Sequence, residues 1–232
     1  MKQLVAFDLD GTLAESKGQL QEPMQNALAD LLDVADVAVI SGGDWPQFEK
    51  QVASRLPERA NRKRLWLMPT TGTKLYTYDD RGWRQVYAEL FDDETREKIK
   101  TAFHDSLEAT GFKPEKTWGD LVEDRGSQIT FSALGQQAPL EAKDKWDPDH
   151  EKRKQLQKIL QGMLPDLSIN IGGSTSIDIT RKGVDKAYGL KKLAATVGIA
   201  HDDILFLGDA IFPGATTIRR RRWGSIRCAC AT

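Results

Sequence analysis

Short apolar runs alternate with segments that have one apolar face over the first part of the chain. Leu4–Phe7 and Val34–Ile40 have the length of buried strands, and Met24–Asp33 between them repeats apolar residues at helical spacing. A strand, a helix and a second strand predict a right-handed crossover, which begins a doubly wound α/β sheet. The same pattern predicts a helix over Trp45–Leu56, and then strands over 65–68, 74–78 and 83–87.

The pattern changes after residue 87. Charged helices with an apolar face are expected over Asp92–Ala109 and Pro148–Leu160, with strands over 119–123, 128–133, 167–171 and 176–180. Such a segment predicts an antiparallel sheet with helices on one face. The first pattern resumes with a helix over Lys186–Val197 and a strand over Asp203–Leu207. We therefore expect an α/β core of residues 1–87 and 181–232, with a smaller α+β domain inserted as residues 88–180.

Composition narrows the class of protein. The chain has 232 residues, 40% hydrophobic and 29% charged, and its formal net charge of −1 gives no argument for binding nucleic acid or an anionic membrane. No apolar run has the length of a membrane span, and we expect no leader segment before the first strand. We expect a cytoplasmic protein, a monomer or homodimer. The cysteines, Cys228 and Cys230, predict no disulfide framework.

Two carboxylates follow the first apolar run. Asp8 and Asp10 are two residues apart, and Gly11 lets the backbone turn away after them. Carboxylates this close repel each other unless a cation lies between them or one holds a proton. The pattern suits phosphoryl transfer assisted by Mg²⁺, with one carboxylate as nucleophile and the other as general acid and base. The alternative is an acidic turn that caps a helix.

Other polar residues follow strands of the same predicted sheet. Ser41 comes directly after one strand and Gly208-Asp209 after another, and the carboxyl ends of parallel strands meet at one edge. Lys186 opens the helix that precedes the last of these strands. Taken singly, a Ser-Gly pair is usually a turn and a lysine at a helix start is usually solvated. The ordered set is a stronger signal than any of its members.

In this order, Asp8-x-Asp10-Gly11-Thr12, Ser41, Lys186 and Gly208-Asp209 resemble the four motifs of the haloacid dehalogenase-like (HAD) phosphotransferases. The segment between the second and third motifs is similar to the α/β cap of HAD subfamily IIB. Within it, Ile171–Asp178 looks like the phosphomannomutase branch, as does Pro213-Gly214 after the fourth motif. The resemblance implies a doubly wound, Rossmann-like HAD core with an inserted α+β cap.

The resemblance also implies a mechanism for a small phosphorylated substrate. Asp8 would attack phosphorus to form an aspartyl-phosphate, and Asp10 would protonate the leaving alkoxide and later deprotonate water. Ser41 and Lys186 would hold phosphate oxygens. Mg²⁺ would be coordinated through oxygen by Asp8, the Asp10 carbonyl and Asp209. The candidate substrate-binding residues are Thr12, Gly42, Gly43, Arg125, Ser176 and Asp178.

Three positions depart from the pattern of this branch. Two anion-binding arginines of the cap correspond by spacing to Gln136 and Lys143, and a core arginine corresponds to Lys17. Replacing an arginine by glutamine removes a charge and a fork of donors, which weakens a second phosphate site. We therefore favour a sugar-phosphate phosphatase. The alternatives are a phosphomannomutase and a catalytically impaired, binding-only protein, the latter suggested by Thr216 and Thr217.

The C-terminal sequence fits the family poorly. Arg219–Arg222 is a run of basic residues that is usually a solvated or nucleic-acid-binding patch. If one G is restored before the codon for Ala215, a permitted codon choice reads Gly-Gly-Asn-Asp-Tyr-Pro-Ala-Ala-Lys-Val-Gly-Leu, which resembles the family's metal loop followed by a helix. We hypothesise that the chain is out of frame from about Ala215 onward.

Overall fold

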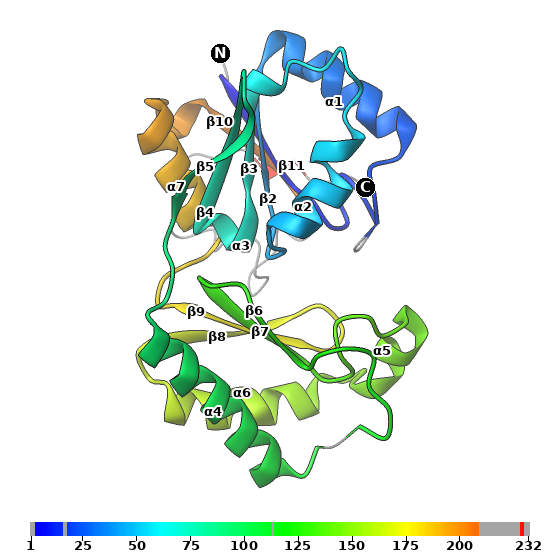
Figure 1. The fold of residues 1–232 in the computed structure, drawn as a ribbon, viewed down its shortest axis with the longest axis vertical. Coiled ribbons are helices and arrows are strands. Elements are labelled where there is room, and N and C mark those ends of the chain that lie inside the picture. The colour runs from blue at the N-terminus through cyan, green and yellow to red at the C-terminus, as the bar shows by residue number, and fades with distance from the viewer. Residues whose placement is uncertain (1–2, 16–17, 113, 209–227, 230–232) are drawn as a thin grey trace. The chain divides into compact units, whose positions relative to one another are not determined.

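The computed structural model describes residues 3–15, 18–112, 114–208 and 228–229. The chain divides into two compact units (Figure 1): unit 1 comprises Met1–Ala88 and Val184–Thr232, and unit 2 comprises Glu89–Gly183. The pattern of the sequence places these boundaries after residues 87 and 180. Unit 2 is therefore one continuous segment, whereas unit 1 is built from two.

The described residues of unit 1 form one sheet with the strand order β11-β10-β1-β2-β3-β4-β5. Its parallel strands are β1 (Leu4–Asp8), β2 (Asp36–Ile40), β3 (Leu65–Met68), β10 (Ile204–Leu207) and β11 (Cys228–Ala229). An antiparallel hairpin, β4 (Lys74–Asp79) and β5 (Gly82–Ala88), extends the sheet at the other side. The helices are α1 (Glu22–Val34), α2 (Trp45–Gln51), α3 (Pro69–Gly72) and α7 (Lys186–Val197), with 3₁₀ turns at Ala53–Arg55, Arg62–Arg64 and His201–Asp203.

The strands of unit 1 bury both faces. In β2, Val37 and Val39 pack in one apolar cluster with Leu28 of α1, while Ala38 and Ile40 pack in a second cluster with residues of α7. Figure 1 shows the same arrangement, with α1 and α2 on one face of the sheet and α7 on the other. The expected doubly wound α/β core is confirmed.

The C-terminal ends of α1 and α2 differ from the sequence prediction. Val34 ends α1 instead of opening β2, and its side chain is 77% exposed, so its apolar character is not a strand signal. α2 ends at Gln51 instead of Leu56, since the chain continues as the 3₁₀ turn Ala53–Arg55. Neither difference moves a candidate site residue.

Unit 2 has an antiparallel sheet with the strand order β6-β7-β9-β8. Phe103 of α4 stacks on Phe131 of β7 with ring centroids 5.5 Å apart, and Leu156 of α6 joins the same cluster. Figure 1 shows α4 and α6 side by side on one face of this sheet. The expected α+β arrangement is confirmed. The elements are α4 (Asp93–Thr110), β6 (Val122–Asp124), β7 (Gln128–Ser132), α5 (Leu140–Trp146), α6 (Glu151–Met163), β8 (Leu167–Gly172) and β9 (Ser176–Arg181).

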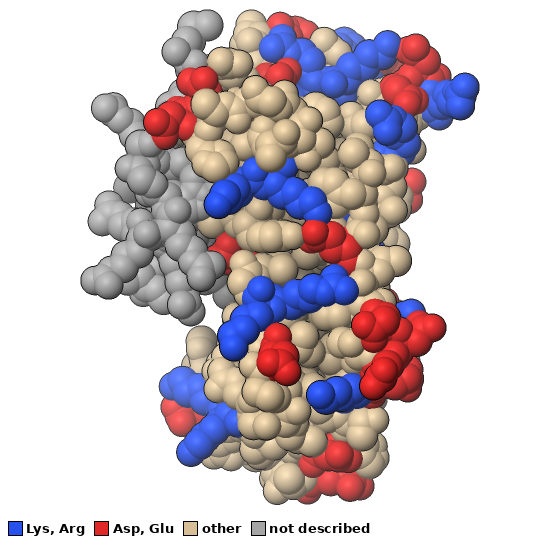
Figure 2. All heavy atoms as spheres, turned by 90° about the vertical axis from the view of Figure 1, so that its left-hand side faces the viewer, with Lys and Arg blue, Asp and Glu red and all other residues tan. Residues whose placement is uncertain are grey.

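The surface of the described residues is mixed in charge. On the face drawn in Figure 2, basic and acidic side chains lie among one another. Within the described ranges, no helix combines the length and the apolar character that crossing a membrane requires.

Candidate functional site

Asp8 lies at the carboxyl end of β1, an interior strand of the unit 1 sheet between β10 and β2. The residue is 5% exposed, and its Oδ1 accepts a hydrogen bond of 2.8 Å from the backbone amide of Leu9. Its Oδ2 forms an ion pair with Nζ of Lys186, the first residue of α7. The fold therefore joins the first and third predicted motifs at one carboxylate.

Asp10 lies in the turn that follows β1. Gly11 has a φ of 80°, a left-handed conformation, and its amide donates to the carbonyl of Ala14 at 2.8 Å. The hydroxyl of Ser41 donates to Oδ2 of Asp10 at 3.1 Å. Because Ser41 directly follows β2, the second predicted motif reaches the first at the edge where the parallel strands end.

Thr12 supplies a buried hydroxyl in the same turn. Its Oγ1 has no hydrogen-bond partner among the described residues, although buried polar atoms nearly always have one. The turn also borders a cavity of about 320 Å³ whose other walls are mainly apolar, among them Phe7, Met24 and Leu207. The hydroxyl of Thr12 can donate a hydrogen bond to a phosphate oxygen, whereas the apolar walls of the cavity cannot.

A strained turn holds the loop of Ser41, Gly42 and Gly43. The amide of Thr71 donates to the carbonyl of Ser41 at 2.9 Å, and the amide of Thr70 donates to the carbonyl of Gly43 at 2.8 Å. Thr70 and Thr71 have φ values of 49° and 60°, the left-handed region that β-branched residues rarely adopt. The pattern of the sequence predicts a turn here, but not that the turn fixes the Ser41 loop.

The same turn brings α7 close to the sheet. A Cβ added at Gly72 would lie 2.6 Å from Cα of Gly189, a distance that requires one of the backbones to shift. Two glycines thus let the first half of α7 pack directly on the turn. This close approach places Lys186, which precedes Gly189 by three residues, beside Asp8. The pattern of the sequence alone did not reveal the close approach of α7 to the turn.

The donors at this edge fit a magnesium ion. Asp8 presents a carboxylate oxygen and Asp10 a backbone carbonyl oxygen, and oxygen atoms are the ligands that a hard divalent cation prefers. In the described part of the chain, no group of three His, Cys, Asp or Glu side chains is close enough to hold a metal. The third predicted ligand, Asp209, lies outside the described residues, as do Lys17, Thr216, Thr217 and Arg219–Arg222.

The candidate residues of unit 2 lie on its sheet. Oδ1 of Asp178 accepts hydrogen bonds from the hydroxyl of Thr130 at 2.7 Å and from Nε2 of Gln128 at 3.1 Å. Arg125, in the turn between β6 and β7, pairs with Glu123 at 2.7 Å. Desolvation raises the pKa of Asp178, and the nearby positive charge of Arg125 opposes that rise without cancelling it.

One further candidate residue lies on the sheet of unit 2. Ser176 opens β9, opposite Ser132 of β7. Thr130 and Gln128 are hydrogen-bond partners of Asp178 that sequence reasoning missed. Their positions across the sheet from Asp178 are consistent with the period-2 alternation of β7, but only the register of β7 against β9 identifies them.

Two positions correspond by spacing to arginines of the phosphomannomutase branch. Nζ of Lys143 donates to the backbone carbonyl of Gln136 at 3.4 Å, and Lys143 is 9% exposed. The ammonium group of Lys143 is therefore directed, at least in part, at the protein's own backbone.

Comparisons with known proteins show the family of the chain. The sequence model for the haloacid dehalogenase-like hydrolases matches residues 5–211. This chain belongs to that family. Among solved structures, a HAD-like hydrolase from Bacteroides thetaiotaomicron has a TM-score of 0.64 at 14% identity, over 90% of this chain and 82% of that chain. At such identity the likeness shows the fold alone.

The sequence relatives of this HAD-like chain include phosphomannomutases. That of Encephalitozoon cuniculi is 25% identical over 218 residues, which cover 92% of this chain and 82% of the relative. That of Saccharomyces cerevisiae is 24% identical over 216 residues, 91% of this chain and 82% of the relative. An IMP-nucleotidase structure from Plasmodium falciparum has a TM-score of 0.68 at 13% identity; it covers 99% of this chain, which spans only 65% of the nucleotidase. The resemblance to the phosphomannomutase branch is confirmed.

Proposed function

We propose that this HAD-like hydrolase removes the phosphate group from a small phosphorylated metabolite, a sugar phosphate, through a covalent intermediate on Asp8. The observation that carries the proposal is the pairing at one sheet edge: Asp8 with Lys186, and Asp10 with Ser41. A buried carboxylate held by a lysine and a backbone amide is oriented for attack, and a second carboxylate two residues away can move a proton.

The reaction has two steps. A carboxylate oxygen of Asp8 attacks phosphorus and the bond to the substrate oxygen breaks, while Asp10 gives its proton to that leaving oxygen. Asp10 then takes a proton from a water molecule as the water attacks phosphorus, which releases inorganic phosphate and restores Asp8. Lys186 offsets negative charge on Asp8 and on the phosphate oxygens. The buried hydroxyl of Thr12, the hydroxyl of Ser41 and the backbone of Gly42 and Gly43 would supply donors to the phosphate.

HAD-like hydrolases generally use Mg²⁺, and the proposed ligands here are Asp8, Asp10 and Asp209. When bound, the ion would neutralise charge on the transferring phosphoryl group. Arg125, Ser176 and Asp178 are proposed to bind the organic part of the substrate. The polar character of these three side chains suits sugar hydroxyls, which both donate and accept hydrogen bonds.

Phosphate release from a panel of sugar phosphates, with Mg²⁺ present, tests the proposal. Asp8→Asn should lower kcat by about a thousandfold or more, because the nucleophile is lost. Asp36→Asn is the matched control. It makes the same exchange at the amino end of β2, away from the sheet edge that holds Asp8 and Ser41, where Asp36 pairs with Arg64. This variant should leave activity near wild type. Activity that survives in Asp8→Asn would refute the assignment.

Phosphomannomutase activity is a second candidate, favoured by the names of the sequence relatives. A mutase must hold a bisphosphorylated sugar in two orientations, which calls for a strong second anion site. Incubation of a hexose 1-phosphate with a hexose bisphosphate activator separates the two reactions. Isomerised hexose 6-phosphate would identify a mutase, whereas free inorganic phosphate supports the hydrolase.

A further inference from the structure

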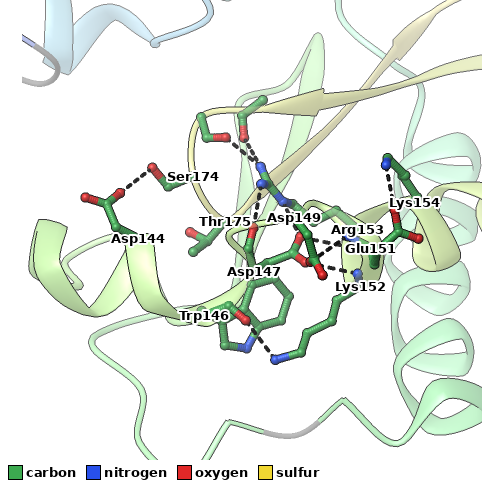
Figure 3. Close-up of polar contacts among 12 residues, drawn as sticks. Asp144, Trp146, Asp147, Asp149, Glu151, Lys152, Arg153, Lys154, Ser174 and Thr175 are labelled. Carbon is green, nitrogen blue, oxygen red and sulfur yellow. Dashed lines mark hydrogen bonds and ion pairs between the residues drawn. The ribbon is translucent and has the colours of Figure 1, made fainter.

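A fully buried ion pair links α6 of unit 2 to the segment before it. The side chains of Arg153 and Asp147 are both 0% exposed, with Nε of Arg153 2.7 Å from Oδ2 of Asp147 (Figure 3). The Asp147 carboxylate also accepts from the backbone amides of Lys152 at 3.0 Å and Arg153 at 3.2 Å. Burial alone would raise the pKa of Asp147, but the Arg153 and amide hydrogen bonds outweigh it and hold the pKa below its usual range. Buried pairs often add little net stability, so the position of this one invites another explanation.

Arg153 reaches beyond Asp147 to the turn between β8 and β9. Its guanidinium donates to the carbonyl of Gly172 at 3.2 Å and to the carbonyl of Gly173 at 2.5 Å. Figure 3 shows the guanidinium between the carboxylate on one side and the turn on the other. A planar fork of donors can bind three acceptors in this way, which a single ammonium group cannot.

The remaining residues of the turn are also held. The hydroxyl of Ser174 donates to Asp144 at 3.0 Å. The carbonyl of Thr175 accepts from the amide of Ala133 at 3.1 Å, and its hydroxyl lies 3.3 Å from that of Ser132. The turn is thus fixed on both sides, and the Arg153 side chain that holds its backbone is fully buried.

The turn between β8 and β9, held by these contacts, limits where the Asp178 carboxylate can lie. A Cβ added at Gly172 would come within 2.7 Å of Oδ2 of Asp178, so the carboxylate rests against the bare Cα of this glycine. The other carboxylate oxygen, Oδ1, is held by Thr130 and Gln128. Gly172 therefore forms one wall of the position of Asp178, and Arg153 holds the carbonyl of that same glycine.

We propose that Arg153 is a positioning residue for substrate binding: it fixes the Gly172–Gly173 backbone and thereby holds the Asp178 carboxylate in the geometry that recognises substrate hydroxyls. Asp147 in turn orients Arg153. This inference rests on the proposed function, in which Asp178 binds the substrate. It assigns a role to a buried ion pair that takes no part in the chemistry at Asp8.

Two variants test the inference from different sides. Arg153→Lys keeps the charge but loses the fork of donors, and Gly172→Ala keeps the ion pair but places a methyl group against Asp178. Each should raise KM about tenfold with kcat within about threefold of wild type, since the loss is in binding and not in the chemical step. Gly172→Ala keeps the test decisive if Arg153→Lys does not fold.

Leu156→Ala is the matched control. Leu156 lies on the same helix and is 1% exposed, so this variant destabilises unit 2 without removing any hydrogen bond to the turn. Its KM should stay at the wild-type value. A KM that rises equally in Leu156→Ala and Arg153→Lys would overturn the inference, because general loosening of unit 2 would then explain both.

A double-mutant cycle tests whether Arg153 acts through Asp178. If it does, Arg153→Lys combined with Asp178→Asn should raise KM no more than Asp178→Asn alone. Additive effects would overturn the inference.

A readout without substrate separates this inference from the proposed function. Amide hydrogen exchange at Ala133, relative to Ile129 in the strand that precedes it, should accelerate in Arg153→Lys and not in Leu156→Ala, because the Ala133 amide is bonded to the turn. Unchanged relative exchange would overturn the inference whatever the activity. If the wild-type protein releases no phosphate from any tested substrate, the proposed function is refuted. The positioning role can still be tested in that case, by following the titration of the Asp178 carboxyl with ¹³C NMR. A titration curve that is the same in wild type and in Arg153→Lys would refute the positioning role.

Discussion

The left-handed turn at Thr70 and Thr71 predicts that Thr71→Gly stabilises the protein. Thr71 has φ 60° and ψ 29°, and among the described residues no hydrogen bond is made by its hydroxyl. Its backbone amide, which glycine retains, makes the bond to the carbonyl of Ser41. The substitution should therefore relieve strain while keeping the contact that holds the Ser41 loop.

The size of the effect is a difference of two opposing contributions. A β-branched residue in the left-handed region costs about 1–2 kcal/mol, which glycine does not incur. Glycine adds freedom to the unfolded chain, which lowers stability by roughly 0.5–1 kcal/mol. The net gain is about 0.5–1 kcal/mol, which for a chain of this length corresponds to a rise in Tm of about 1–4 °C.

Urea denaturation followed by circular dichroism measures this gain. Thr71→Asn should stabilise at least as much, since asparagine tolerates the left-handed region without the entropic cost of glycine. Thr77→Gly is the control, because Thr77 lies in the extended strand β4, where glycine should destabilise. If Thr71→Gly and Thr77→Gly lower the free energy of unfolding by similar amounts, the argument from strain is wrong.

Three other outcomes concern pH, metal and the coding sequence. Because the folded-state pKa of Asp178 is raised, its contribution to stability is present below its unfolded pKa of about 4 and is lost as pH rises through the folded value. Asp178→Asn should therefore be more stable than wild type at pH values above the folded-state pKa of Asp178. Urea denaturation across pH 4–8 would measure this difference. A free energy of unfolding that varies with pH in the same way in both proteins would contradict the prediction. Removal of divalent cations with EDTA should abolish phosphate release and Mg²⁺ should restore it; full activity in EDTA would exclude the metal role. Finally, the coding DNA from Pro213 to Thr232 should hold an uninterrupted second frame that begins near Ala215, and DNA without that frame would rule out the hypothesis.

The pattern of apolar and polar residues predicted the core of unit 1, because the signals within each element and the expected pairing of parallel strands agree there. The apolar run into Asp8, the turn permitted by Gly11 and the strand before Ser41 each indicate a strand end, and parallel strands gather such ends at one edge. The contact between Asp8 and Lys186 was implied by the family resemblance and not by the periodicity of the chain. It depends on two glycines, Gly72 and Gly189, that allow α7 to approach, and periodicity carries no information on such a contact.

Unit 2 was predicted less completely. α5 was missed because it is short and charged, and α6 begins at Glu151 instead of Pro148, since the amides of its first turn are taken by the Asp147 carboxylate. The sequence pattern predicted only a charged helix around Arg153, with no sign that this side chain is fully buried. A charged residue is buried only when its partners are in place, and its contacts with Gly172 and Gly173 depend on tertiary structure.

The sequence pattern did not predict the C-terminal strand of the unit 1 sheet. The short strand β11 was not predicted, and it pairs in parallel with β10 through Phe206 and Leu207. Two residues are too few to show an alternation, so only the neighbouring strand identifies them as part of the sheet.

The insertion of unit 2 into unit 1 has a consequence for synthesis on the ribosome. β1 pairs on one side with β2, which follows soon after it, and on the other with β10, where Leu4 lies opposite Ile204. Glu89–Gly183 must be translated before β10 exists, a delay on the order of 5–20 s at typical elongation rates. During that interval unit 2 can fold as a continuous segment, while one edge of β1 stays open to any strand that meets it. A nascent chain stalled before Ile204 would therefore be a natural client for chaperones that shield strand edges.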